Sequence, residues 1–160
     1  FHRAGIGRGG ALVIQEGVRS DQVLWIDEAP AHPVLAQYQA RMESLRQSVN
    51  QALYLGLHDL EAHLAVYPPG SFYQAHLDRF RDSDLRTLTV VLYLNPPDWR
   101  DEDGGHLRFW PVDRESDSLL LQPAGGTLVT FLSDRFWHAV EPAGRTRLSV
   151  TGWFRRRPAL

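Results

Sequence analysis

The 160-residue sequence contains no cysteine. Disulfide bonds, thiolate zinc sites, iron–sulfur clusters and cysteine nucleophiles are therefore excluded. A chain without thiols suits a reducing compartment, where disulfides are rare. The fold must be stabilised by its hydrophobic core, and a domain of this size can bury enough surface to do so.

The sequence also lacks a strong net charge and any long apolar run. Its formal net charge is −2 at pH 7, so no global field directs it to nucleic acid. No apolar run reaches the roughly 18 residues of a membrane span, and no basic-then-apolar signal peptide opens the chain. The one basic cluster, residues 155–157, is interpreted as a solvated tail. These absences predict a protein with neither a nucleic-acid partner nor a membrane partner.

The length predicts a single domain over residues 1–160. Because the chain begins with phenylalanine, we expect an N-terminal element to be missing from it. Residues 4–10 are rich in glycine and predict a loop. Residues 21–27 predict a strand. Residues 32–55 predict an amphipathic helix, since apolar side chains recur there every three or four positions, and Gly56 is the expected helix cap.

After residue 60 the pattern changes to short β-rich runs separated by turns rich in proline and glycine. Strands at this regular spacing predict a sandwich or a barrel-like jelly roll. The fold class is therefore mainly β with a flanking helix (α+β), the helix packing outside the β core. The seven predicted strands are residues 62–67, 85–94, 106–110, 118–122, 127–132, 139–141 and 147–154.

His76 and Asp78 form a His-x-Asp pair. In an extended segment, residues two apart point to the same face, so the imidazole and the carboxylate can converge on one ion. His138, just before a predicted strand, is the best candidate for a third ligand. Two histidines and one carboxylate on one face leave open coordination positions, an arrangement that is typical of Fe(II) oxygenases. His76 as a surface histidine and His138 as a core histidine are the alternatives.

Arg147 begins the last predicted strand, nine residues after His138. An otherwise apolar strand rarely carries an inward arginine unless its charge is paired. A dicarboxylate ligand would supply that partner, and the planar guanidinium suits a bidentate grip. The alternative is a strand-end arginine that extends to solvent.

Several motifs together resemble the prolyl 4-hydroxylase family of the Fe(II)/2-oxoglutarate-dependent oxygenases, in particular the hypoxia-inducible-factor prolyl hydroxylases and their bacterial homologues. The resemblance covers about residues 19–154. It implies the double-stranded β-helix form of the jelly roll, and it implies that an N-terminal helix is missing from this chain. The motifs are Tyr67-Pro68, residues 73–78, residues 93–95, Asp98-Trp99, residues 104–109, residues 133–135, Glu141-Pro142 and Trp153.

The resemblance implies roles for individual residues. His76, Asp78 and His138 would bind Fe(II), and Arg147 and Tyr93 would bind the distal carboxylate of the co-substrate 2-oxoglutarate. His63 stands where the family usually has an apolar residue, so it would either polarise the pocket or face solvent. The pocket lining would comprise Tyr67, Leu107, Val140, Thr151 and Trp153, with β-core packing the alternative for Leu107 and Val140.

The resemblance also implies the reaction and the substrate. The substrate would be a proline in a protein or peptide, hydroxylated with O2 while 2-oxoglutarate yields succinate and CO2. Ascorbate is a further cofactor that the family suggests, and a cytoplasmic location is expected. Arg19, Asp21 and Arg86 would lie near the substrate entrance, with Arg86 pairing with Asp21.

Two alternatives to prolyl hydroxylation are open. One is a hydroxylase of a free amino acid or another small molecule, and the other is a jelly-roll sensor that binds a metal without turnover. Nucleic-acid-dealkylating relatives usually carry a second arginine six residues after the first. Trp153 occupies that position here, which argues against a nucleic-acid substrate.

Overall fold

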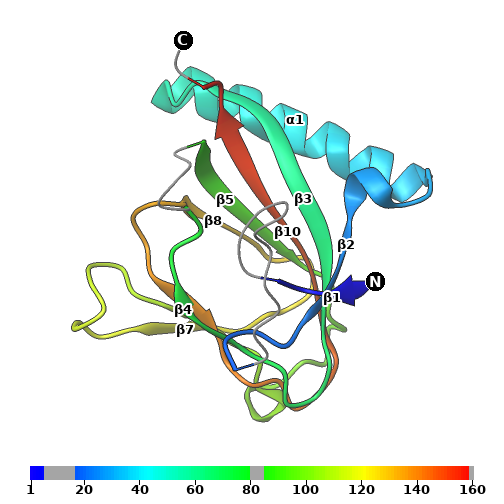
Figure 1. The fold of residues 1–160 in the computed structure, drawn as a ribbon, viewed down its shortest axis with the longest axis vertical. Coiled ribbons are helices and arrows are strands. Elements are labelled where there is room, and N and C mark those ends of the chain that lie inside the picture. Colours follow the sequence, from blue (N-terminus) through cyan, green and yellow to red (C-terminus); the bar gives the residue numbers. More distant parts are fainter. Residues whose placement is uncertain (6–16, 80–84, 159–160) are drawn as a thin grey trace.

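The computed structural model describes residues 1–5, 17–79 and 85–158 (Figure 1). Most of the glycine-rich stretch that was predicted to be a loop lies outside these residues. Two antiparallel sheets and one long helix make up the fold. Short 3-10 helices at Ile26–Glu28 and Asp101–Asp103 connect strands.

The larger sheet has six strands in the order β1-β2-β3-β10-β5-β8. The two strands at its centre pair along most of their length, from Arg147 opposite Tyr67 to Arg156 opposite Leu57. All its neighbouring strands are antiparallel. Its members are β1 (His2–Arg3), β2 (Gln22–Trp25), β3 (Leu57–Tyr67), β10 (Arg147–Arg156), β5 (Arg86–Tyr93) and β8 (Leu128–Leu132).

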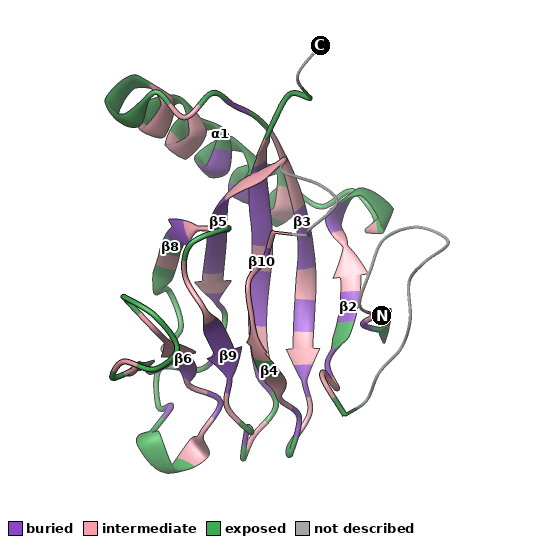
Figure 2. Cartoon of the chain, turned by 60° about the vertical axis from the view of Figure 1, so that its left-hand side comes forward, coloured by how far each residue is buried: buried purple, intermediate pink, exposed green. Residues whose placement is uncertain are grey.

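The smaller sheet has four strands in the order β4-β9-β6-β7. Its strands are β4 (Tyr73–His76), β9 (His138–Val140), β6 (Leu107–Phe109) and β7 (Leu119–Leu121). In Figure 2 the burial colours mark β5, β9 and β10 as largely buried. Two facing antiparallel sheets form the double-stranded β-helix, so the predicted fold class is confirmed.

Helix α1 (Pro33–Leu53) covers the outer face of the larger sheet (Figure 1). Its first turn has Pro33 at N1 and is capped by His32, whose side chain accepts from the Val34 amide at 3.2 Å. Tyr38 and Met42 face the sheet and pack into a core with Phe154. Among the helices of the described residues, none is long and apolar enough to cross a membrane.

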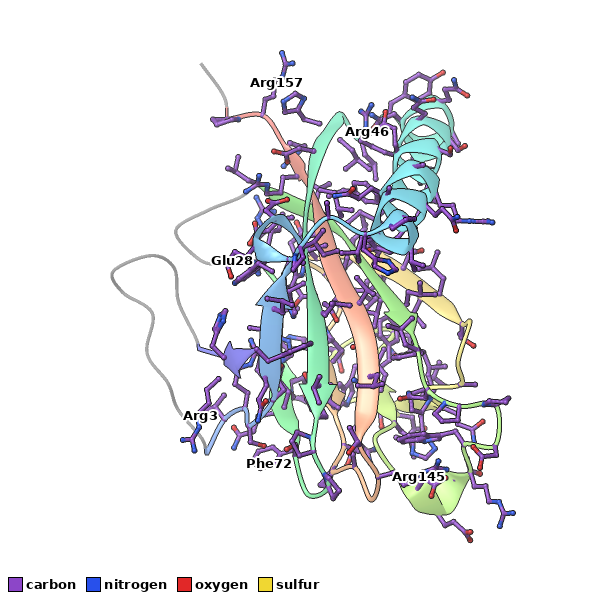
Figure 3. All side chains as sticks on the ribbon, turned by 90° about the vertical axis from the view of Figure 1, so that its right-hand side faces the viewer. Arg3, Glu28, Arg46, Phe72, Arg145 and Arg157 are labelled. Atoms are coloured by element: carbon purple, nitrogen blue, oxygen red, sulfur yellow. The ribbon has the colours of Figure 1, made fainter. Side chains whose placement is uncertain are left out.

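The predicted cap at Gly56 is wrong. Tyr54 adopts the left-handed conformation (φ 54°) and donates its amide to Asn50, which ends the helix at Leu53. Asn50 and Arg46 then hold the start of β3 by donating to the Leu57 carbonyl at 2.8 and 2.7 Å. Figure 3 shows the labelled Arg46 between the helix and the sheet. Side-chain bonds across this turn therefore replace the glycine cap that the sequence suggested.

The central strands are longer than the sequence predicted. The predicted run 62–67 begins at Leu57 in the structure, and the predicted run 147–154 continues to Arg156. Arg155 is therefore no part of a solvated tail, because it lies in β10 and pairs with Asp59 at 2.7 Å and Glu61 at 3.1 Å. Polar residues at these strand ends hid the β pattern, and their ion pairs across β3 and β10 explain why the strands extend.

Phe154 tests how much the contact between helix and sheet contributes to stability. Its ring is 1% exposed within the core that α1 covers. Phe154→Ala is expected to lower the free energy of unfolding by about 3–5 kcal/mol, through lost burial and the cavity left behind. Urea denaturation followed by circular dichroism measures this loss. Phe1→Ala is the control, since Phe1 is 60% exposed; an equal loss in both variants would contradict the assignment of the core.

Candidate active site

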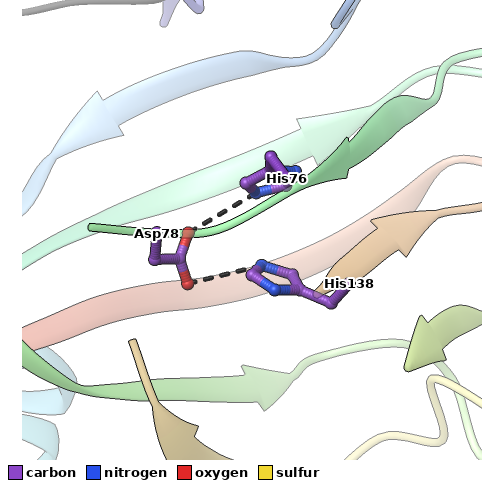
Figure 4. Close-up of side chains that lie close together, drawn as sticks. All are labelled: His76, Asp78 and His138. Carbon is purple, nitrogen blue, oxygen red and sulfur yellow. Dashed lines mark ion pairs between the residues drawn. The ribbon is translucent and has the colours of Figure 1, made fainter. Parts of the chain in front are cut away.

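Three side chains that are distant in sequence meet between the two sheets (Figure 4). His76 ends β4 and lies opposite His138 in β9, so strand pairing brings the two imidazoles together. Asp78 follows β4, two residues after His76, and points to the same centre. Its oxygens lie 3.4 Å from His76 Nε2 and 3.3 Å from His138 Nε2. One ligand atom from each residue lies within 4.8 Å of the others.

Backbone carbonyls fix the orientation of both imidazoles. His76 Nδ1 lies 2.7 Å from the Gln74 carbonyl, and His138 Nδ1 lies 3.1 Å from the Phe136 carbonyl. A carbonyl only accepts, so each Nδ1 carries the hydrogen and donates it. Each Nε2 then points toward Asp78 and is the nitrogen available to a metal ion. This is the tautomer that metal-binding histidines use, with the second nitrogen held by a neighbouring acceptor.

A buried hydroxyl pair holds the carboxylate of Asp78. The Thr89 hydroxyl lies 2.8 Å from Asp78 Oδ2 and donates to it, and the Ser133 hydroxyl lies 2.9 Å from Thr89. The Asp78 amide also donates to the Ser133 carbonyl at 3.1 Å. The sequence interpretation missed Thr89 and assigned no role to Ser133, which it named only as part of a motif. A threonine inside the apolar run of β5 was the one available signal, since a buried hydroxyl needs a partner.

The electrostatics of the three residues favour a bound cation. Burial alone would raise the pKa of Asp78, but the charge of His138 and hydrogen bonds from both imidazoles hold that pKa well below its usual value. Burial and the nearby His138 lower the pKa of His76, whereas Asp78 outweighs burial and raises the pKa of His138. An ionised, buried carboxylate beside two imidazole nitrogens is a donor set that fits Fe(II).

Arg147 begins β10 and is buried, with 2% exposure. Its Nε donates to the Gly105 carbonyl at 2.8 Å, and its guanidinium carbon lies 4.9 and 5.1 Å from the ring centres of Tyr67 and Tyr93. No carboxylate in the described part of the chain forms an ion pair with it. The buried Tyr93 hydroxyl likewise finds no hydrogen-bond acceptor there. A buried, unpaired guanidinium is costly, so this end of the site fits an anionic ligand.

Gly105 makes the burial of Arg147 possible. It has a positive φ (67°), and a Cβ there would lie 3.0 Å from the Arg147 Cδ. The second glycine of the double-glycine motif therefore allows close packing against the Arg147 side chain.

A cavity of about 130 Å³ connects Arg147 with the three residues His76, Asp78 and His138. Two predicted site residues lie next to residues that line the cavity. Tyr93 lies beside Arg147. Asp21 accepts two hydrogen bonds, of 2.8 and 2.6 Å, from Arg19. The structure thus gathers the predicted site residues around one cavity. Those that line it are His76, Asp78, His138, Arg147, Tyr67, Leu107, Val140, Thr151, Trp153, Arg19 and Arg86.

The predicted pair between Asp21 and Arg86 is wrong. Asp21 bonds to Arg19, two residues before it. Arg86 instead bonds to Glu61 at 2.7 Å and lies 3.5 Å above the Trp153 ring. Glu61 competes for Arg86 because it lies opposite Trp153 in the neighbouring strand β3. His63, left open between pocket and solvent, is buried and lines the cavity.

Comparison with known proteins places this geometry in a family. The family described as the 2OG-Fe(II) oxygenase superfamily matches residues 62–155, more than half of the chain. The chain belongs to the 2OG-Fe(II) oxygenase superfamily. The match includes the two histidines, the aspartate and the arginine of the cavity, so the predicted resemblance is confirmed at the level of the family.

Solved oxygenase structures share the fold of the whole domain. A prolyl-4-hydroxylase of Pseudomonas putida is 51% identical, with a TM-score of 0.82 over 90% of this chain and 76% of that chain. A prolyl hydroxylase of Trichoplax adhaerens, solved with a peptide of hypoxia-inducible factor, is 28% identical, with a TM-score of 0.81 over 96% of this chain and 70% of that chain.

Curated relatives of this oxygenase include Egl nine homolog 1. The human protein is 31% identical over 96% of this chain, and the rat protein is 30% identical over the same share. The chain spans 38% of the human protein and 48% of the rat protein.

A substitution at Thr89 tests whether its hydrogen bond to Asp78 strengthens metal binding at the site. Thr89→Val keeps the shape of the side chain but removes the donor to Asp78 Oδ2. We expect roughly 10- to 100-fold weaker metal binding, the usual effect of losing a partner of a metal ligand. Competition with a chelator, with Mn²⁺ or Zn²⁺ as the ion, measures it. Thr130→Val on the exposed face of β8 is the matched control; equal affinities in the two variants would contradict the role of Thr89.

Proposed function

We propose that this chain is an Fe(II)- and 2-oxoglutarate-dependent hydroxylase that acts on a prolyl residue in a protein or peptide. The observation that carries the proposal is a buried guanidinium, unpaired among the described residues, in the same cavity as the His76, Asp78 and His138 triad. A metal-binding sensor without turnover would have no need for that cation. The proposal treats residues 1–160 as one oxygenase domain.

His76, Asp78 and His138 would hold the Fe(II). With 2-oxoglutarate and O2 the bound metal supplies oxidation of a substrate C–H bond, with succinate and CO2 as by-products. The protein orients the reactants and keeps water out. The hydrogen bonds to the Gln74 and Phe136 carbonyls and to Thr89 hold each ligand group in place before the metal binds.

Arg147 and Tyr93 would bind the distal carboxylate of 2-oxoglutarate. The guanidinium supplies the charge, and the Tyr93 hydroxyl supplies a donor with no other partner among the described residues. This end of the cavity is closed by apolar and aromatic groups, which strengthens the charge-assisted contact. The co-substrate would be lined by Tyr67, Leu107, Val140, Thr151 and Trp153.

Two features support a prolyl substrate. The Pseudomonas putida relative, which is 51% identical to this chain, is a prolyl-4-hydroxylase. The cavity is also lined by Trp153, with Arg86 above its ring, and by Arg19, which Asp21 holds. An aromatic face suits an apolar pyrrolidine ring, and the arginines suit peptide carbonyls. A small-molecule substrate would be the outcome if free amino acids, and no peptides, are turned over.

Ascorbate as a cofactor and a cytoplasmic location stay predictions that the resemblance alone supports.

Succinate release tests the reaction. With Fe(II), 2-oxoglutarate and O2, we expect the protein to release succinate in a manner that depends on a proline-containing peptide, and the peptide to gain 16 Da. Asp78→Ala and His138→Ala are expected to abolish both signals, because each removes a metal ligand. Asp117→Ala, on the exposed surface, is the control. Full turnover by a folded Asp78→Ala variant would refute the ligand assignment.

Arg147 tests the co-substrate site. Arg147→Ala should raise the KM for 2-oxoglutarate, because it removes a charge-assisted contact worth about 1.5–3 kcal/mol, and Arg147→Lys should have a smaller effect. Initial-rate kinetics at saturating peptide measure both. Arg157→Ala is the control, since Arg157 is exposed in the last residues of the described chain. An unchanged KM in the Arg147→Ala variant would argue against this role.

A further inference from the structure

The two imidazoles of the metal site differ in what covers them. His138 lies in the interior, where the Phe131 ring packs against it with ring centres 4.7 Å apart, and its side chain is 7% exposed. His76 belongs to β4, the edge strand of the smaller sheet, and its side chain is 18% exposed. Besides His138, the aromatic ring that the described residues place against His76 is that of Tyr73.

The Tyr73 ring stacks on the imidazole of His76, with ring centres 3.6 Å apart and planes inclined by 17°. In a regular strand, residues three apart point to opposite faces. The pairing of β4 is irregular at this point, since Tyr73 lies opposite Val140. His76 lies opposite His138, so three steps along β4 match two steps along β9. The extra residue, as in a β-bulge, brings the two rings to the same face.

The segment of residues 17–20 holds the irregular part of β4. The Gln74 amide donates to the Val18 carbonyl at 2.8 Å, and the Gln74 side chain donates to the Gly17 carbonyl at 2.8 Å. The carbonyl of Gln74 accepts the hydrogen bond from His76 Nδ1. One residue of β4 therefore connects this segment with a metal ligand.

Arg19, in the same segment, covers the Tyr73 ring. Its guanidinium carbon lies 4.3 Å from the ring centre. Because the imidazole of His76 occupies one face of that ring at 3.6 Å, the guanidinium lies over the other face, where it attracts the ring. Asp21 fixes the guanidinium through two hydrogen bonds. These side chains thus form one column, from Asp21 to His76.

The stack restricts a motion that the hydrogen bond to Gln74 leaves free. One hydrogen bond at Nδ1 allows the imidazole of His76 to rock about the N–H···O direction, which would carry Nε2 away from the metal position. A ring packed flat against the imidazole prevents this rocking. A ligand group that is already in place loses less freedom when the metal binds, so the site gains affinity.

We infer that Tyr73 is a positioning residue of the metal site, which holds the imidazole of His76 in its ligating orientation, and that Arg19 acts on the site through the Tyr73 ring. The inference rests on the metal-ligand role of His76 in the proposed function. It adds a part in metal binding to the place of Arg19 in the cavity wall.

Metal affinity without turnover tests the role of Tyr73. The probe is Co²⁺, whose visible absorption reports its ligands, titrated in competition with a chelator. Tyr73→Leu should weaken binding roughly three- to tenfold, the range that an aromatic contact accounts for, and should alter the Co²⁺ bands. Tyr73→Phe keeps the ring and should bind within about twofold of the wild type. Phe72→Leu is the matched control, since Phe72 is the neighbouring aromatic residue and is not among the described residues that line the cavity.

The outcomes separate the inference from the proposed function. Equal Co²⁺ affinities of the wild type and Tyr73→Leu, or an equal loss in Tyr73→Phe or Phe72→Leu, would overturn the inference and leave the metal ligands as assigned. If Tyr73→Leu does not fold, Tyr73→Gln repeats the test with a polar side chain at this partly exposed position. Unchanged binding by His138→Ala would overturn the ligand assignment and the inference together.

A double-mutant cycle tests the role of Arg19. Arg19→Gln is measured in the wild type and in Tyr73→Leu, so the direct effect of the lost charge on Co²⁺ binding is common to both and cancels. The remaining coupling should be about two- to fivefold in affinity, the range of a guanidinium over an aromatic face. Additive effects of the two substitutions would overturn the role of Arg19.

Discussion

The pairing of β10 with β3 on one side and β5 on the other determines where the functional side chains lie. Alternate residues of β10 face the cavity, and each has a partner on the same face of a neighbouring strand. Arg147 thereby meets Tyr67, and Trp153 meets Thr89. One long antiparallel strand fixes the distance between the Arg147 end of the cavity and the end that holds His76, Asp78 and His138, because a backbone held on both edges cannot slide.

The site depends on keeping two buried charges of opposite sign apart. Asp78 is neutralised in part by two imidazoles, whereas Arg147 contacts a carbonyl and two aromatic rings and has no carboxylate partner among the described residues. If Asp78 and Arg147 lay side by side, their charges would pair with each other and leave no place for ligands. The sheet prevents this, and the unfavourable burial of both charges is offset elsewhere, by the core that α1 forms with the outer face of the larger sheet. A bound cation and a bound dicarboxylate would then relieve the burial cost of each group.

The sequence was sufficient for the features that depend on local spacing. Strand periodicity gave the β core, and the His-x-Asp spacing placed His76 and Asp78 on one face. Several contacts that depend on tertiary neighbours were not predicted. The choice of Arg19 rather than Arg86 as the partner of Asp21 depends on where Glu61 lies across the sheet. The helix end depends on Asn50, whose side chain bonds to the backbone of Leu57 across the turn.

The same distinction separates the two halves of the cavity. In the half that contains Arg147, the residue type alone indicates the chemistry, since a buried arginine favours a counter-charge wherever it lies. In the other half, the position of a residue in its strand decides whether it lines the cavity. His63 is one of seven histidines in the chain, and its register against Thr151 and Trp25 turns it toward the cavity. A shift of one residue in β3 would point it to the opposite face.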